Sequence, residues 1–122
     1  MSQMLLSINP EHVENILLGN KRFEFRKVRC RTDINRIIIY STSPVMRVVA
    51  EAEVLGIIED NPASVWDLTF EYAGISKSFF DKYFEGKEKA VAYHLGKITK
   101  YSRPKTLSDY GINFAPQSFV YV

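Results

Sequence analysis

LGNKRFEFRK, residues 18–27, joins the end of a predicted helix to a predicted strand. Gly19 accepts the left-handed backbone conformation that ends many helices, and Asn20 suits the same turn. Apolar and polar side chains then alternate, which is typical of a strand. Phe23 and Phe25 share one side of that strand, and we expect them in the core. The opposite side carries the charged residues Arg22, Glu24 and Arg26.

The charged side of this strand has two interpretations. Lys21 follows the turn directly, and its long side chain can reach either face of the strand. An ammonium, a carboxylate and guanidinium groups are therefore gathered beside a helix end. They can form a solvated strand face, which is common in antiparallel sheets, or they can form a ligand site.

Basic residues are concentrated around the same stretch. The 122-residue chain has a net charge of only +2, which is lower than usual for a protein that binds nucleic acid over its whole surface. Seven of its 16 lysines and arginines lie within positions 21–36: Lys21, Arg22, Arg26, Lys27, Arg29, Arg31 and Arg36. This cluster can hold a few phosphates, or it can be a loop that is basic for solubility.

Length and composition predict one domain over residues 1–122, which is large enough to bury a core without metal or disulfide. Cys30 is the single cysteine, so an internal disulfide and a cysteine-rich zinc site are excluded. We expect no metal and no cofactor. No targeting segment or membrane-spanning run is evident, and a cytoplasmic location is expected.

The patterning predicts a mixed α+β fold. Asn9 and Pro10 begin a helix that ends at Gly19, and a pair of helices is expected between Asn61 and Gly86. A charged loop is predicted for residues 28–35. Arg103 and Pro104 are expected to end the fifth strand. The predicted strands are residues 4–8, 23–28, 36–40, 47–58, 90–101 and 118–122.

Other polar residues are further candidates for a site. The turn after the third strand offers three hydroxyls and free backbone amides, from Ser41, Thr42 and Ser43, and Tyr93 is a further candidate for the wall of a cleft. His12, in the first helical turn, is expected to be solvated. The aromatic cluster in residues 79–84 is expected in the core. His94 is interpreted as a structural residue, and Glu51 and Glu53 are interpreted as surface acids.

Gly19, Lys21, Glu24 and Arg26 form G-x-K-x-x-E-x-R, which resembles the signature of the ASCH domain, a small β-barrel of the PUA-like superfamily. Segments further along the chain are similar to a subgroup of small prokaryotic ASCH proteins that are often labelled transcriptional regulators. The resemblance covers nearly the whole chain. It implies a PUA-like barrel with flanking and inserted helices, and RNA or a modified nucleoside or nucleotide as partner.

Some small ASCH proteins hydrolyse acetylated cytidine nucleosides, using the motif Lys, a Thr three residues later and a Glu near the inserted helices. Lys21 matches that set. Glu24 stands where those enzymes have Thr, so the hydroxyl nucleophile is absent. The nearest carboxylate to the third position is Glu71. If the chain is an enzyme, Glu24 is a candidate base and Lys21 a candidate oxyanion stabiliser.

We expect an RNA- or nucleotide-binding module that uses the motif strand, with a role in RNA metabolism or in regulation linked to transcription or translation. A nucleoside amidohydrolase and a metal-independent ribonuclease remain alternatives. DNA is a less suitable partner, because the predicted helix pair carries more acidic than basic residues. The oligomeric state is left open. The expected ligand-binding residues are Lys21, Arg22, Glu24, Arg26, Lys27, Ser41, Thr42, Ser43 and Tyr93.

Overall fold

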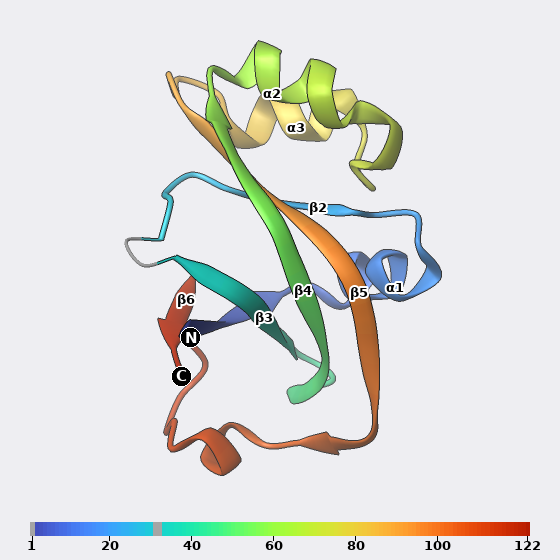
Figure 1. Cartoon of the computed structure of the whole chain (residues 1–122), viewed down its shortest axis with the longest axis vertical. Coiled ribbons are helices and arrows are strands. Elements are labelled where there is room, and N and C mark those ends of the chain that lie inside the picture. Colours follow the sequence, from blue (N-terminus) through green and yellow to red (C-terminus); the bar gives the residue numbers. More distant parts are fainter. Residues whose placement is uncertain (1, 31–32) are drawn as a thin grey trace.

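The computed structural model describes residues 2–30 and 33–122, and its elements surround one curled six-stranded sheet (Figure 1). The strands are β1 (Ser2–Ile8), β2 (Phe23–Arg26), β3 (Ile34–Ser41), β4 (Arg47–Asp60), β5 (Ala90–Lys105) and β6 (Phe119–Tyr121). The helices are α1 (Pro10–Leu18), α2 (Pro62–Thr69) and α3 (Lys77–Tyr83), with short 3₁₀ turns η1 (Phe70–Tyr72) and η2 (Leu107–Tyr110).

The strand order is β2-β5-β4-β3-β1-β6. β1 and β3 are parallel, with α1 and β2 in the connection between them, and the other pairs are antiparallel. β6 pairs with β1, so the two ends of the chain lie close together (Figure 1). β6 lies within residues 118–122, the last strand predicted from the sequence. The mixed α+β class predicted from the sequence is confirmed.

The ends of the helices follow local sequence signals. The side chain of Asn9 accepts a hydrogen bond from the backbone of Glu11, Pro10 begins α1, and Gly19 ends it with φ 87°. Asn61 caps α2 and Ser76 caps α3 through equivalent side-chain bonds. Together α2 and α3 form an insert between β4 and β5, above one end of these long strands in Figure 1.

Buried side chains cover both faces of the sheet. One core lies between α1 and the sheet, with Met4, Ile16 and Tyr93 among its members. A second core lies under the insert, where Phe25 and Phe80 meet edge to face at 5.2 Å. A third surrounds the end of the sheet near η2.

The fifth strand differs from its prediction because β5 continues through Pro104 to Lys105. The register with β4 jumps between the pairs Ala50–Lys100 and Val48–Lys105, so Pro104 lies in a bulged part of the strand. Proline is accepted there because its missing N–H is not required by the ladder. In the part of the chain that the structure describes, no helix has the length and apolar character needed to cross a membrane.

Candidate functional site

The motif strand β2 is covered on both faces. Phe23 and Phe25 are buried in the core under the insert, as expected from the alternation. Glu24 on the opposite face is only 6% exposed, and Lys21 just before the strand is 2% exposed. The interpretation of a solvated strand face is therefore wrong for Lys21 and Glu24. The reason is tertiary, because α1 and the insert close over this face from either side.

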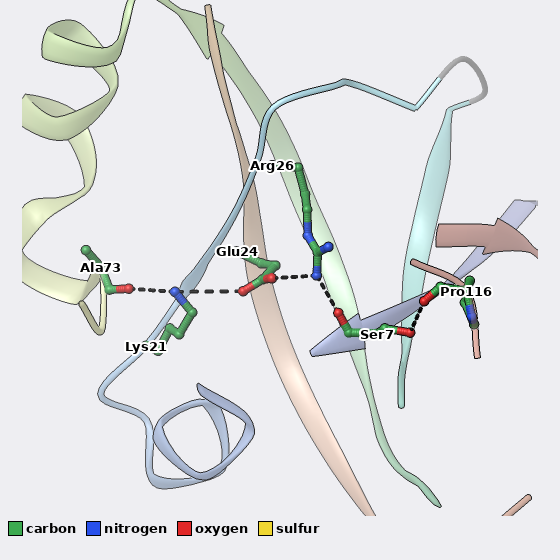
Figure 2. Close-up of polar contacts among 6 residues, drawn as sticks. All are labelled: Ser7, Lys21, Glu24, Arg26, Ala73 and Pro116. Carbon is green, nitrogen blue, oxygen red and sulfur yellow. Dashed lines mark hydrogen bonds and ion pairs between the residues drawn. The ribbon is translucent and has the colours of Figure 1, made fainter. Parts of the chain in front are cut away.

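A continuous chain of polar contacts crosses this buried region (Figure 2). Lys21 Nζ donates a hydrogen bond of 2.8 Å to the carbonyl of Ala73 and lies 3.8 Å from Glu24 Oε1. Arg26 Nη2 donates to Glu24 Oε2 at 2.9 Å and to the carbonyl of Ser7 at 2.7 Å. The chain therefore joins the insert to β2 and β2 to the end of β1.

Lys21 is fixed in place by apolar contacts as well as polar ones. Its ammonium lies 4.9 Å from the centre of the Phe25 ring. A Cβ atom placed on Gly74 would lie 2.4 Å from Lys21 Cβ and 2.6 Å from Lys21 Cγ. Gly74 also has φ +71°, a conformation that glycine adopts readily. The glycine thus lets the insert approach the lysine stem closely.

Beside this polar chain lies a cavity of about 160 Å³, which we call the seam cavity. Its lining combines the end of β1, the start of α1, the motif strand and the insert. The lining residues are Ser7, Ile8, Asn9, His12, Lys21, Glu24, Phe25, Arg26, Ile75, Phe79 and Tyr83. A wider groove of about 740 Å³ adjoins it and shares Asn9, His12, Ile75 and Phe79.

His12 lines the seam cavity and is partly buried, so the expectation of a fully solvated surface residue is wrong. Its ring meets the half-exposed Phe79 ring edge to face, with centroids 5.6 Å apart. Its Nδ1 is buried and has no hydrogen-bond partner among the described residues. Burial lowers the pKa of His12, and the positive charge of Lys21 lowers it further. The imidazole is therefore mainly neutral at neutral pH.

The two cations of the polar chain have different surroundings. Burial lowers the pKa of Lys21, while the nearby carboxylate of Glu24 opposes that shift. Arginine side chains stay charged in proteins. The buried Nε of Arg26 has no hydrogen-bond partner among the described residues. With one carboxylate and two cations, the seam cavity has a net positive charge and a neutral histidine at its side.

Tyr83 and Phe79 were expected in the core, but both line the seam cavity. Phe79 is 49% exposed, and burial raises the pKa of Tyr83, which keeps its hydroxyl protonated. Lys27 lies over the Tyr83 ring, 4.7 Å from its centre, outside the lining of the cavity. Helical spacing correctly grouped these aromatics but could not separate those that face a cavity from those that face the core.

The remaining predicted residues lie elsewhere. Arg22 stacks on Tyr72 at 4.3 Å and borders two other hollows, together with His94. Tyr93 is fully buried in the core, and its hydroxyl accepts a hydrogen bond from the backbone N–H of Cys30. It therefore cannot form the wall of a cleft as predicted.

The hydroxyl turn after β3 contacts the end of β1 through the bond from Thr42 N–H to the Ile8 carbonyl, but it does not line the seam cavity. Ser41 is buried at the end of β3, while Ser43 is exposed, and neither these residues nor Thr42 contributes to the lining. Glu51 accepts a hydrogen bond from the Tyr101 hydroxyl and pairs with Arg36, which is a structural role. Arg31 of the basic cluster lies outside the described residues.

Sequence reasoning missed several lining residues: Ser7, Ile8, Asn9, His12, Ile75, Phe79 and Tyr83. One usable signal was available for His12. The Asn9 cap fixes the start of α1, and a residue in that first turn lies close to the end of the strand before it. The residues of the insert carried no such local signal, because their place depends on how the insert packs.

Comparison with solved structures identifies the family. The crystal structure of ASCH from Zymomonas mobilis matches with a TM-score of 0.89 at 30% identity, covering 98% of this chain and 87% of that one. The chain belongs to the ASCH domain family. A mutant form of the Zymomonas mobilis protein matches this ASCH domain with a TM-score of 0.90 at 28% identity, over 100% of this chain and 91% of that one. The PUA-like barrel expected from the motif is thereby confirmed.

Curated proteins give a similar result. An ASCH domain-containing ribonuclease from Zymomonas mobilis is 33% identical to this ASCH domain over 94 residues, which is 76% of this chain and 64% of that protein. A large ribosomal subunit protein uL22 from Ureaplasma parvum is 31% identical over 121 residues. That match covers 98% of this chain but only 39% of the uL22 protein. No family model matches the chain.

Proposed function

We propose that this ASCH domain binds RNA and that the seam cavity receives one nucleotide of the strand. The observation that carries the proposal is the buried chain Lys21–Glu24–Arg26 at the wall of a cavity. Buried ion pairs add little stability compared with apolar residues of the same volume. Ligand binding gives a better reason for three charged groups in this position than fold stability does.

The charge of the seam cavity suits a phosphodiester. Lys21 and Arg26 carry two positive charges against the single negative charge of Glu24, and the lowered pKa of His12 keeps it mainly neutral. The balance is one positive charge, which one phosphodiester group would neutralise. A short basic site of this kind is also compatible with the small net charge of the whole chain.

The size of the cavity favours an unstacked strand. A cavity of roughly 150 Å³ is known to take one benzene ring, so about 160 Å³ suits a single ring or a phosphate group rather than a duplex. Phe79 is exposed at the border between the cavity and the wider groove, where it offers a face for base stacking. We therefore expect single-stranded RNA, with the neighbouring nucleotides along the groove.

RNA cleavage is a second candidate function. Two observations favour it: a histidine lies in the same cavity as the cationic groups, and one relative is named a ribonuclease. For hydrolysis of an acylated nucleoside the support is weaker. Glu71 borders the groove but does not line the seam cavity, so the third group of those enzymes has no counterpart there.

A binding titration tests the proposal. Fluorescent single-stranded RNA is titrated at two salt concentrations with the wild type, with Lys21→Met and with Lys87→Ala as control. Met keeps the lysine stem that packs against Gly74, and Lys87 is an exposed residue with the same charge, away from the seam cavity.

Loss of one charge-assisted hydrogen bond, worth about 1.5–3 kcal/mol, corresponds to roughly 10- to 150-fold weaker binding for Lys21→Met. The control should change the affinity by less than about threefold, since it removes only a distant, screened charge. Equal losses in both variants would contradict a role for the seam cavity. Tight binding of duplex RNA in preference to a single strand would also contradict it.

A further inference from the structure

We propose that the seam cavity cleaves RNA by internal transphosphorylation, with His12 as the proton acceptor and Lys21 as the proton donor. This inference rests on the proposed RNA binding and assigns a reaction to the same site. It requires a neutral base, a separate acid and a positive group near one phosphodiester. The described residues provide all three around a single cavity.

His12 has the surroundings of a functional histidine. A solvated surface histidine would be exposed, and a structural one would have its ring nitrogens paired, whereas His12 Nδ1 is buried without a partner among the described residues. The first turn of α1 holds the ring in the cavity, and Phe79 supports it edge to face. Because burial and Lys21 lower its pKa, the imidazole is free to accept a proton at neutral pH.

Lys21 is the best proton donor among the cations of the seam cavity. Its ammonium is held by the carbonyl of Ala73 at 2.8 Å, and burial lowers its pKa, which makes it a stronger acid than an ordinary lysine. Glu24 at 3.8 Å favours the charged form and so keeps a proton available. Arg26 does not release a proton in proteins, so its role is to stabilise negative charge.

The reaction needs no external nucleophile. His12 takes the proton of the ribose 2′-hydroxyl, and the 2′-oxygen forms a bond to the adjacent phosphorus. The bond between phosphorus and the 5′-oxygen breaks, and that oxygen receives a proton from Lys21. The Arg26 guanidinium offsets the negative charge that develops on the phosphoryl oxygens. The products are a 2′,3′-cyclic phosphate and a 5′-hydroxyl, and solvent returns the proton from His12 to Lys21.

The pH dependence follows from the groups that face His12. Lys21 and Arg26 disfavour its protonation, while Glu24 and Glu11 favour it, and burial is the largest effect and lowers the pKa. The rate should therefore rise with pH up to a point below 6.5, the ordinary value for histidine. In His12→Gln, any remaining activity should no longer rise with pH in this acidic range.

The decisive experiment uses a short single strand of deoxynucleotides with one ribonucleotide, in the presence of EDTA. Cleavage is followed by mass spectrometry of the new ends, and binding is measured separately on the same strand. The variants are His12→Gln, Lys21→Arg and, as control, His94→Gln. His94 is stacked on Phe23 at 4.7 Å and does not line the seam cavity.

We expect cleavage 3′ to the ribonucleotide with cyclic phosphate ends, and none when that residue is replaced by its 2′-deoxy form. His12→Gln should lower the rate by about 10²–10⁴-fold with binding retained. Lys21→Arg keeps the charge but cannot supply a proton, so it should also bind and fail to cleave. The control should cleave at the wild-type rate.

Three results would overturn the inference. Ends with a 3′-hydroxyl and a 5′-phosphate would mean attack by water rather than by the 2′-hydroxyl. Full activity of His12→Gln would remove the proposed base. Binding of RNA without any cleavage would reject the reaction and leave the proposed binding function intact, whereas absence of binding would reject both.

Discussion

Gly74→Ala tests how the insert positions the lysine of the site. The new methyl group would lie 2.4–2.9 Å from three carbons of the Lys21 stem, well inside van der Waals contact. The backbone at this position, with φ +71°, is also unfavourable for alanine. The variant should therefore lose stability for two separate reasons and should also move Lys21 away from Ala73.

A matched control separates the two contributions to the loss of stability in Gly74→Ala, the backbone penalty and the steric penalty. Gly86 has φ +75° and no atom within 4 Å of an added Cβ, so Gly86→Ala carries only the backbone penalty of about 1–2 kcal/mol. Gly74→Ala carries the same penalty and an overpacking term of about 1–3 kcal/mol. We expect its free energy of unfolding to fall by roughly 2–5 kcal/mol.

Urea denaturation of both variants measures the two losses, and the RNA titration then asks whether the site is intact. Gly74→Ala should bind RNA more weakly than Gly86→Ala under conditions where both remain folded. Equal losses of stability, together with equal affinities, would refute the view that Gly74 holds Lys21 in position.

Three further predictions follow from the buried groups. Phe25→Ala should lower the free energy of unfolding by about 3–5 kcal/mol, because the ring is 6% exposed in the core under the insert; a loss below about 1 kcal/mol in urea denaturation would contradict this. Glu24→Gln removes a buried carboxylate that lies between the buried Lys21 and the partly buried Arg26, and it should destabilise by about 3–5 kcal/mol. Asp81→Asn breaks an exposed pair and should cost less than about 1 kcal/mol. Similar losses in the two variants would show that the Glu24 pairs are effectively solvated. The pKa of His12 is lower in the folded chain than in the unfolded chain, so the unfolded chain binds more protons just below pH 6.5. The free energy of unfolding should therefore fall as the pH falls through that range. His12→Gln should flatten this dependence on pH, and an unchanged slope would contradict the burial of the ring.

Local signals in the sequence were sufficient for much of the fold. Asn9, Pro10 and Gly19 bound α1 as predicted, and Asn61 and Ser76 cap the helices of the insert. These positions are determined by hydrogen bonds and backbone conformations within a few residues, so a single sequence contains the necessary information.

The composition of the site was harder to predict because both faces of the strands are covered. Tyr93 alternates correctly along β5, but its face packs against a core rather than a cleft. Glu24 and Lys21 both line the seam cavity, although alternation could not indicate that they are buried. His12 and Phe79 come together only when α1 and the insert pack on the sheet, and no local pattern encodes that meeting.

The seam cavity has walls of two different origins. Its charged groups, Lys21, Glu24 and Arg26, belong to the motif segment and are anchored to the sheet, whereas Ile75, Phe79 and Tyr83 belong to the insert between β4 and β5. The insert is joined to these charged groups through a backbone carbonyl, that of Ala73, rather than through a side chain. A change in the insert would therefore alter the shape of the seam cavity and leave the charged groups of the motif segment in place.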